Sequence, residues 1–183
     1  MPETEIGEWM LRSIYRKLLA VRSRFMREWR SRRTMRCVAS CKSRPNVNAK
    51  CSFTRTTHLG HNTNFNGVQI VGGGKVVIGD NFHSGTEVRM ITQNHRYDDG
   101  DSIPYDSKEY LLLDIHIGDN VWIGDRVILL GGITIGEGSI IQAGSVVVSD
   151  IPRCSIAGGH PAKVFKMRDV DHYEKLKSAG KFA

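Results

Sequence analysis

Aliphatic residues in the second half of the chain recur at every sixth position. The main series is Ile117, Ile123, Leu129, Ile135, Ile141 and Val147. A second series, interrupted by a polar Ser139, lies two residues earlier and consists of Ile115, Val121, Val127 and Ile133. A period of six residues fits neither one face of an α-helix nor a single alternating strand, but it suits short strands joined by tight turns.

These short strands predict a β-solenoid, in which each six-residue unit forms one flat side of a coil. The inward aliphatic side chains of stacked coils then share one continuous core. Glycine follows the main series at Gly118, Gly124 and Gly136, as expected at corners where φ is positive or backbones approach closely. A β-sandwich would show irregular spacings of roughly 8 to 12 residues per strand and turn. We therefore expect an all-β, parallel β-helix from about residue 47 to residue 164.

The repeat has one break in its register. A weaker form of the pattern begins near Val76 and Ile78, but Ile78 and Ile117 are 39 residues apart, which is not a multiple of six. The polar stretch ITQNHRYDDGDSIPYDSKEY, residues 91–110, lies at this break. We expect residues 92–114 to leave the wall of the solenoid as a loop, and loops of this length are usually functional or disordered.

The N-terminal part favours an amphipathic helix from Ile6 to about Trp29. Basic residues flank an apolar stripe there, as in helices that lie in a membrane interface, so residues 6–30 are a candidate for peripheral membrane contact. The alternative is that the stripe packs on its own protein or on a sister subunit, which is the commoner arrangement. The basic, irregular residues 31–50, with Pro45, predict a linker. The stripe, spaced 3, 4, 3 and 4 residues, is Leu11, Ile14, Leu18, Val21 and Phe25.

The positive charge is concentrated in the same region. Residues 1–50 hold 13 Lys and Arg against 4 Asp and Glu, a balance of +9; the rest hold 13 against 15, a balance of −2, and the sum is the net +7. Such a segment suggests an anionic neighbour such as lipid, polysaccharide or nucleic acid, although a solvated helix face also explains it. We expect no nucleic acid, because the aromatic residues of this segment fit a helical stripe better than a stacking platform.

Cysteine usage and hydropathy bear on the compartment. The four cysteines form no C-x-x-C pair, so we expect reduced thiols and no zinc framework. No apolar run approaches the roughly 18 residues that span a bilayer, and no signal-peptide pattern opens the chain. The expected location is the cytoplasm, with association at the inner face of the membrane as an option that the basic helix leaves open.

The expected organisation has three parts within 183 residues. Residues 1–44 form the basic amphipathic helix and linker. Residues 45–165 form the β-helix, from which the loop 92–114 protrudes. Residues 166–183 form a tail with a short polar helix. A chain of this length is sufficient for one domain with a substantial core.

Two segments of the repeat resemble the hexapeptide-repeat acyltransferases. They are GDNVWIGDRVILLGGITIGEGSIIQAGSVVVSDIP, residues 118–152, and AGGHPAKVFK, residues 157–166, within a wider resemblance over residues 60–168. The resemblance implies a left-handed parallel β-helix, a homotrimer with active sites between neighbouring β-helices, and acetyl-CoA as co-substrate with no metal. The left hand rests on the resemblance alone, since the general rule for parallel crossovers predicts the right hand.

The polar stretch carries the candidate catalytic residue, His95. Acyl transfer from a thioester to an alcohol needs a base for the hydroxyl proton and an acid for the departing thiolate, and one imidazole can supply both near neutral pH. QNHRY, residues 93–97, resembles the catalytic-histidine segment of galactoside, maltose, xenobiotic and surface-polysaccharide O-acetyltransferases. We expect His83 to lie at a coil corner. The remaining histidines, expected to be structural or exposed, are His58, His61, His116, His160 and His172.

The resemblance implies one residue for the acceptor, Asn64, in TNFN at residues 63–66. An asparagine at this position helps to hold the acceptor sugar in the family. An acidic residue of the sugar-specific relatives is missing near residues 72–74, where this chain has three glycines. The identity of the acceptor therefore stays open.

The resemblance implies six positions for the acetyl-CoA donor. An indole lines the pantetheine channel, an alanine meets the pantetheine arm through its backbone, and two lysines face the coenzyme A phosphates, where a point charge suffices. Two further residues replace a Thr-Lys pair near the nucleotide phosphates, which reduces side-chain contact there. The indole is Trp122, the alanine is Ala143, and the two lysines are Lys163 and Lys166. The residues in place of the Thr-Lys pair are Val148 and Ser149.

The expected function is acetyl-CoA-dependent O-acetylation of a sugar hydroxyl in bacterial surface-polysaccharide synthesis. The alternatives within the enzyme class are O-acetylation of an antibiotic and N-acetylation of an amino sugar. Carbonic anhydrases built on the same solenoid need an H-x-x-x-x-H pair, and no two histidines here are five residues apart. A trimeric scaffold without catalysis is the alternative outside enzymes.

Overall fold

A computed structural model describes residues 3–182, with the backbone alone at residues 3–11 and 107. Leu11, the first residue of the expected apolar stripe, therefore lies outside the described side chains. The terminal residues 1, 2 and 183 of the expected N-terminal and tail segments lie outside the described part altogether.

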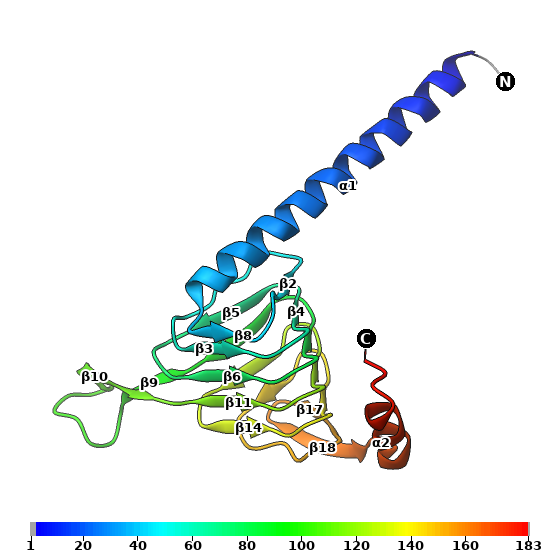
Figure 1. The fold of residues 1–183 in the computed structure, drawn as a ribbon. Coiled ribbons are helices and arrows are strands. Elements are labelled where there is room, and N and C mark those ends of the chain that lie inside the picture. Colours follow the sequence, from blue (N-terminus) through cyan, green and yellow to red (C-terminus); the bar gives the residue numbers. More distant parts are fainter. Residues whose placement is uncertain (1–2, 183) are drawn as a thin grey trace.

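The chain forms a left-handed parallel β-helix with one helix at each end, which is the fold class expected from the sequence (Figure 1). Its coils stack three walls of strands. The first wall is β1 (Ser40–Cys41), β3 (Thr57–Leu59), β6 (Val76–Ile78), β11 (Ile115–Ile117) and β14 (Ile133–Ile135). The second wall is β2 (Asn46–Val47), β4 (Asn64–Phe65), β7 (His83–Ser84), β12 (Trp122–Ile123), β15 (Ile140–Ile141), β17 (Ser155–Gly159) and β18 (Ala162–Met167). The third wall is β5 (Val68–Val71), β8 (Val88–Ile91), β13 (Ile128–Leu130) and β16 (Val146–Val147).

The core is the aliphatic series that the period of six predicts. All six residues of the main series are at most 2% exposed, and the aliphatic residues of the second series are buried with them. Ser139, which interrupts the second series, is also buried, and its hydroxyl donates a hydrogen bond to the carbonyl of Pro152 at 2.7 Å. Burial of a hydroxyl that keeps a hydrogen-bond partner costs little free energy, so the core tolerates this polar residue.

The strand register explains the break in the repeat. In the regular part Ile117 of β11 pairs with Ile135 of β14, an offset of 18 residues, or three six-residue units. Across the break Ile117 pairs with Ile78 of β6, an offset of 39 residues. The difference, 39 − 18 = 21 residues, is an insertion into one coil, so the coils above and below it stay in register.

The inserted residues form an ordered hairpin where the sequence predicts a loop. Strands β9 (Gln93–Arg96) and β10 (Asp106–Leu112) pair antiparallel and project from the β-helix (Figure 1). Residues 72–74 are glycines because they pack against the root of this hairpin. A Cβ at Gly74 would lie 2.5 Å from the carbonyl oxygen of Thr92 and 2.6 Å from that of Leu113.

The N-terminal helix α1 (Glu3–Cys37) is longer than the sequence predicts. It continues about two turns past Trp29, and β1 and β2 follow as part of the first coil. Residues 31–50 are therefore not the irregular linker expected. The reason is that Ser31 and Thr34 are buried against the β-helix, and this packing favours the helical form over the bias of a basic segment. The division at residue 44 stays a prediction.

The C-terminal helix α2 (Val170–Ser178) is held at one corner of the β-helix by a ladder of asparagines. The amide of Asn81 donates to Asn120 at 2.9 Å, and the amide of Asn120 donates to the hydroxyl of Tyr173 at 2.9 Å. That hydroxyl in turn donates to the carboxylate of Glu137 at 2.7 Å. The tail is therefore attached to the β-helix by a continuous chain of hydrogen bonds.

A Gly138→Ala variant is expected to lose more stability than a Gly144→Ala variant. Both glycines have positive φ, 71° and 73°, so each alanine costs about 1 kcal/mol in backbone strain. A Cβ at Gly138 would also lie 2.8 Å from Cζ of Tyr173, whereas nothing lies within 4 Å of a Cβ at Gly144. Overpacking should add about 1–3 kcal/mol to the loss at Gly138. Urea denaturation measures both, and equal losses would contradict the docking of Tyr173 at this corner.

The ion pair of Glu137 and Lys177 should make stability depend on pH. Partial burial acts to raise the pKa of Glu137, but hydrogen bonds from Lys177 and Tyr173 lower it below its ordinary 4.5. Since the folded pKa is the lower one, this carboxylate stabilises the protein above pH 4.5, and the contribution disappears as the pH falls through the folded pKa.

The difference in the free energy of unfolding between the wild type and Glu137→Gln is therefore expected to be smaller at acidic pH than at pH 7. Urea denaturation at each pH measures it. The matched control is Glu87→Gln, which removes an exposed ion pair with Arg126. The same narrowing in the control would show that the effect is not specific to Glu137.

Candidate functional site

A row of outward side chains crosses the second wall. The register aligns Asn64 of β4 with His83 of β7, and His83 with Trp122 of β12. It continues from Trp122 to Ile140 of β15. Alternate residues of a strand face opposite sides, so the neighbours of this row point into the core. These buried neighbours are Phe65, Ser84, Ile123 and Ile141.

Trp122 stands 53% exposed in this row and lines two hollows. The first, of about 450 Å³, also contains Asn64 and is bordered by the C-terminal tail. The second, of about 390 Å³, contains Ala143 and Phe165 and has a mainly apolar lining. An apolar hollow beside an indole suits the extended aliphatic and amide arm of a pantetheine group.

The remaining donor candidates lie at the edges of this region. Lys163 and Lys166 are exposed on β18, and Lys166 is aligned with Ile156, which lines the 390 Å³ hollow. Exposed ammonium groups at that edge are free to meet phosphate by charge. Val148 and Ser149 are exposed beyond β16, at the end of the third wall.

His95 lies on β9 of the hairpin between two tyrosine rings. Its ring stacks on Tyr105 with centroids 3.9 Å apart and planes at 22°, and it meets Tyr110 at 4.7 Å and 43°. Two flanking rings hold the imidazole plane in one orientation. Its Nδ1 is buried without a hydrogen-bond partner among the residues that the structure describes.

An ion pair beside His95 stiffens the hairpin. Arg96 donates to Asp99 at 2.5 Å and to Glu109 at 2.7 Å, which links β9 to β10. The hydrogen bond from Arg96 lowers the pKa of Asp99, so this pair stays ionised at neutral pH. The hairpin therefore presents His95 on a braced element rather than on an irregular loop.

The structure brings three of the predicted site residues together and leaves the catalytic candidate apart. Trp122 borders both hollows, Asn64 borders the first and Ala143 borders the second. His95 lines neither of them, because the hairpin leaves the β-helix between the third wall and the first. The predicted residues thus fall into two candidate half-sites, one along the second wall and one, His95, on the hairpin.

The expected position of His83 at a coil corner was wrong, and the two tyrosines beside His95 were not predicted. His83 is in the middle of the second wall, not at a coil corner, because its wall is set by the 39-residue offset to Trp122. That offset equals the one between Ile78 and Ile117 and could have revealed the alignment. Tyr105 and Tyr110 reach His95 only through the pairing of the hairpin, for which the repeat gives no signal.

Neither a candidate metal site nor a disulfide is found in the part of the chain that the structure describes. Within the described residues, no group of three or more His, Cys, Asp and Glu side chains is placed to hold a metal ion. All four cysteines are free thiols.

Sequence comparison relates the chain to acetyltransferases. A family model described as bacterial transferase hexapeptide (six repeats) matches residues 114–149. Galactoside O-acetyltransferase of Escherichia coli (strain K12) is 36% identical over 132 residues, which are 68% of this chain and 62% of that protein. The chain thus spans less than two thirds of this relative, and 58% and 29% of two other curated relatives.

Structure comparison gives the same relationship. A maltose O-acetyltransferase of Clostridium difficile 630 superposes with a TM-score of 0.58 at 36% identity, over 66% of this chain and 63% of that one. A hexapeptide-repeat acetyltransferase of Vibrio cholerae O1 biovar eltor, solved with acetyl coenzyme A, superposes with a TM-score of 0.55 at 31% identity, over 64% and 63%.

Proposed function

We propose, on the premise that this chain is a member of the hexapeptide-repeat acyltransferase family, that it transfers an acetyl group from acetyl-CoA to a hydroxyl of a sugar. The observation that carries the proposal is the 21-residue insertion in the β-helix, which presents His95 on a braced hairpin. The names of two relatives, a galactoside and a maltose O-acetyltransferase, support a sugar hydroxyl as the acceptor.

The chemistry assigns two proton transfers to His95. The imidazole takes the proton of the acceptor hydroxyl as its oxygen attacks the thioester carbonyl carbon. The tetrahedral intermediate then collapses, the carbon–sulfur bond breaks, and the imidazolium returns the proton to the thiolate. The products are the O-acetyl ester and the free thiol of coenzyme A, which carries the proton that the acceptor hydroxyl lost. Stacking between Tyr105 and Tyr110 supports this role, because it fixes the direction of the reacting nitrogen.

The residues of the second wall suit the acetyl-CoA donor. Trp122 and Ala143 line an apolar hollow of about 390 Å³ for the pantetheine arm, with Lys163 and Lys166 exposed near its edge for the phosphates. Val148 and Ser149 lie at the end of the neighbouring wall, where they contribute shape rather than charge.

A homotrimer would join the two half-sites. His95 of one chain and the hollows of a neighbouring chain would then face a shared groove. The hairpin that carries His95 projects from the β-helix (Figure 1), which supports a site completed by a neighbouring chain. Asn64, in the other hollow, is assigned to the acceptor.

We place the enzyme in bacterial surface-polysaccharide synthesis in the cytoplasm. A basic helix at residues 6–30 would hold it near a lipid-linked sugar at the inner face of the membrane. A small diffusible sugar or an antibiotic would have no need of this helix.

The test measures free thiol released from acetyl-CoA by the full chain with panels of sugars, nucleotide sugars, amino sugars and antibiotics. Thiol release that depends on a sugar, with an O-acetyl ester identified by mass spectrometry, is the expected result. Release only with antibiotics, or an amide product from an amino sugar, would assign a different acceptor class. No acceptor-dependent release in any panel, from a folded trimer, would reject acetyl transfer.

A further inference from the structure

Helix α1 exposes the apolar stripe that the sequence predicts. The described members of this apolar stripe are Ile14, Leu18, Val21 and Phe25, and they are 49%, 62%, 67% and 69% exposed. The described part of the stripe does not pack on its own chain, which leaves a membrane interface and a sister subunit as the expected arrangements. Of the helices that the structure describes, none combines the length and apolar character needed to cross a membrane.

The C-terminal end of α1 packs on the β-helix, and this packing orients the apolar stripe away from the β-helix. Ser31 and Thr34 are buried against the first coil, and the hydroxyl of Ser31 accepts a hydrogen bond from the backbone N–H of Val47 at 3.2 Å. At about 100° per residue, these two positions lie on the side of the helix opposite Phe25 and Leu18. Beyond this attachment the helix projects from the body (Figure 1), so the stripe faces the surroundings.

The positive charges of α1 disfavour packing of the apolar stripe against α1 of a second copy of the chain. The spacing of 3 and 4 residues also suits a coiled coil, whose flanking positions would be residues 15, 22 and 29 on one side and 17, 24 and 31 on the other. Three of these six are the cations Arg22, Lys17 and Arg24, and none is an anion. Over residues 12–37 the helix holds ten Lys and Arg against Glu28 alone, which already pairs with Arg32 and Arg44. Like charges would face each other across the seam.

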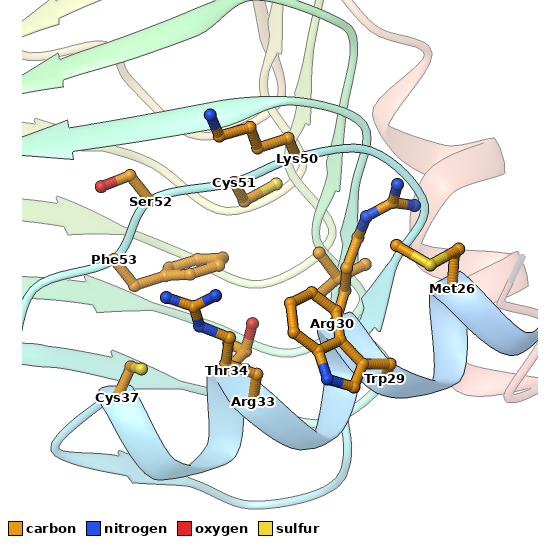
Figure 2. A pocket seen from close by; sticks show the side chains of 11 residues that line it. Met26, Trp29, Arg30, Arg33, Thr34, Cys37, Lys50, Cys51, Ser52 and Phe53 are labelled. Carbon is orange, nitrogen blue, oxygen red and sulfur yellow. The ribbon is translucent and has the colours of Figure 1, made fainter.

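A cationic pocket opens where α1 meets the first coil. It has a volume of about 440 Å³, and its lining includes Arg30, Arg33 and Lys50 without any carboxylate. Figure 2 shows these side chains on the helix and on the facing segment that contains Cys51. Arg30 is positioned by a hydrogen bond to the carbonyl of Asn48 at 2.8 Å. Burial raises the pKa of the Cys51 thiol, so it adds no negative charge to the pocket.

Trp29 joins the pocket to the apolar stripe. Its indole lines the pocket, lies under the guanidinium of Arg33 at 5.4 Å, and is 47% exposed on the helix face next to Phe25. An indole between an apolar face and a set of cations is typical of the boundary between lipid chains and headgroups.

We propose that α1 docks on a bilayer that contains anionic phospholipids, with the apolar stripe in the interface and a lipid phosphate in the cationic pocket. The stripe supplies apolar area, and the cations of the helix supply attraction to the negative surface. This surface is independent of acetyl transfer and stands whether or not that reaction does.

The first experiment sediments the full chain with vesicles of phosphatidylcholine alone or mixed with phosphatidylglycerol. Binding to the mixed vesicles that weakens with added salt is the expected result. Absence of binding, or equal binding to both vesicles, would overturn the proposal.

The second experiment tests the apolar stripe with a variant that carries Leu18→Gln, Val21→Gln and Phe25→Gln. Partition onto the mixed vesicles should fall at least about tenfold, because three side chains lose their apolar contact with lipid. The matched control carries Ala20→Gln and Ser23→Gln on the opposite side of the same helix and should bind as the wild type does. Unchanged binding by the stripe variant, with a smaller oligomer in ultracentrifugation, would show that the stripe joins copies of this chain and would overturn the proposal.

The third experiment tests the cationic pocket with a variant that carries Arg33→Gln and Lys50→Gln. Binding to the mixed vesicles should fall roughly tenfold more than in Arg55→Gln/Lys75→Gln, which loses two exposed positive charges between strands of the β-helix. An equal loss in both double variants would show that only net charge matters and would remove the pocket from the proposal. Thermal unfolding monitored by circular dichroism verifies that each variant is folded.

Discussion

Replacement of His95 by alanine is expected to lower kcat/KM for acetyl transfer about 10²- to 10⁴-fold, the usual contribution of a positioned acid–base group. The loss should appear in kcat, because the imidazole acts on protons that move only in the transition state. The melting temperature should stay near that of the wild type, since His95 lies on the projecting hairpin and not in the core. Steady-state assays of thiol release measure the effect.

The matched control for this variant is His116→Ala. His116 is exposed on β11 between the buried Ile115 and Ile117, and the same substitution there should leave turnover unchanged. Turnover by His95→Ala equal to that of the control would remove His95 from the mechanism while leaving the fold intact.

Truncation of Phe82 to alanine is expected to destabilise the protein by about 3–5 kcal/mol. Phe82 is fully buried, lies in the coil into which the hairpin is inserted, and meets the ring of Phe65 at 5.4 Å. Loss of this ring leaves a cavity that the stacked coils cannot close, because each coil is fixed by hydrogen bonds to the next. Urea denaturation of the full chain measures the change in the free energy of unfolding.

The matched control is Phe25→Ala, the same truncation at a residue that is 69% exposed on α1. Its effect on unfolding should stay within about 0.5 kcal/mol, as for most surface substitutions. A large loss in this control would mean that the stripe of α1 is buried in the folded oligomer.

The period of six was sufficient to predict the β-helix and its core. Every residue of the main series is buried, because a repeat of short strands can satisfy its apolar side only by stacking. The offset of 39 residues between Ile78 and Ile117 also located the insertion, and the register confirms it. These features are encoded locally, in the spacing of aliphatic residues along the chain.

The form of the insertion and the extent of α1 could not be predicted in the same way. The hairpin depends on antiparallel pairing across residues 97–105, and the stacking of Tyr105 on His95 follows from that pairing alone. The last turns of α1 are held by tertiary contacts of Ser31 and Thr34, two residues without a helical signal of their own. The wall that carries each candidate residue depends on the length of the insertion, which explains the error at His83.

The candidate site, like the fold, was predictable from the sequence only in part. The resemblance selected Asn64, Trp122 and Ala143, and in the structure these residues line two hollows that share Trp122. The sequence could not show that His95 would lie apart from these hollows, because that separation depends on where the hairpin leaves the three-sided coil, between the third wall and the first.

The most direct measurement is a crystal structure of the full chain with acetyl-CoA. The account predicts the pantetheine arm beside Trp122 of one subunit, with the imidazole of His95 from a neighbouring subunit within hydrogen-bond reach of the thioester sulfur. An imidazole remote from every bound acetyl-CoA would contradict it.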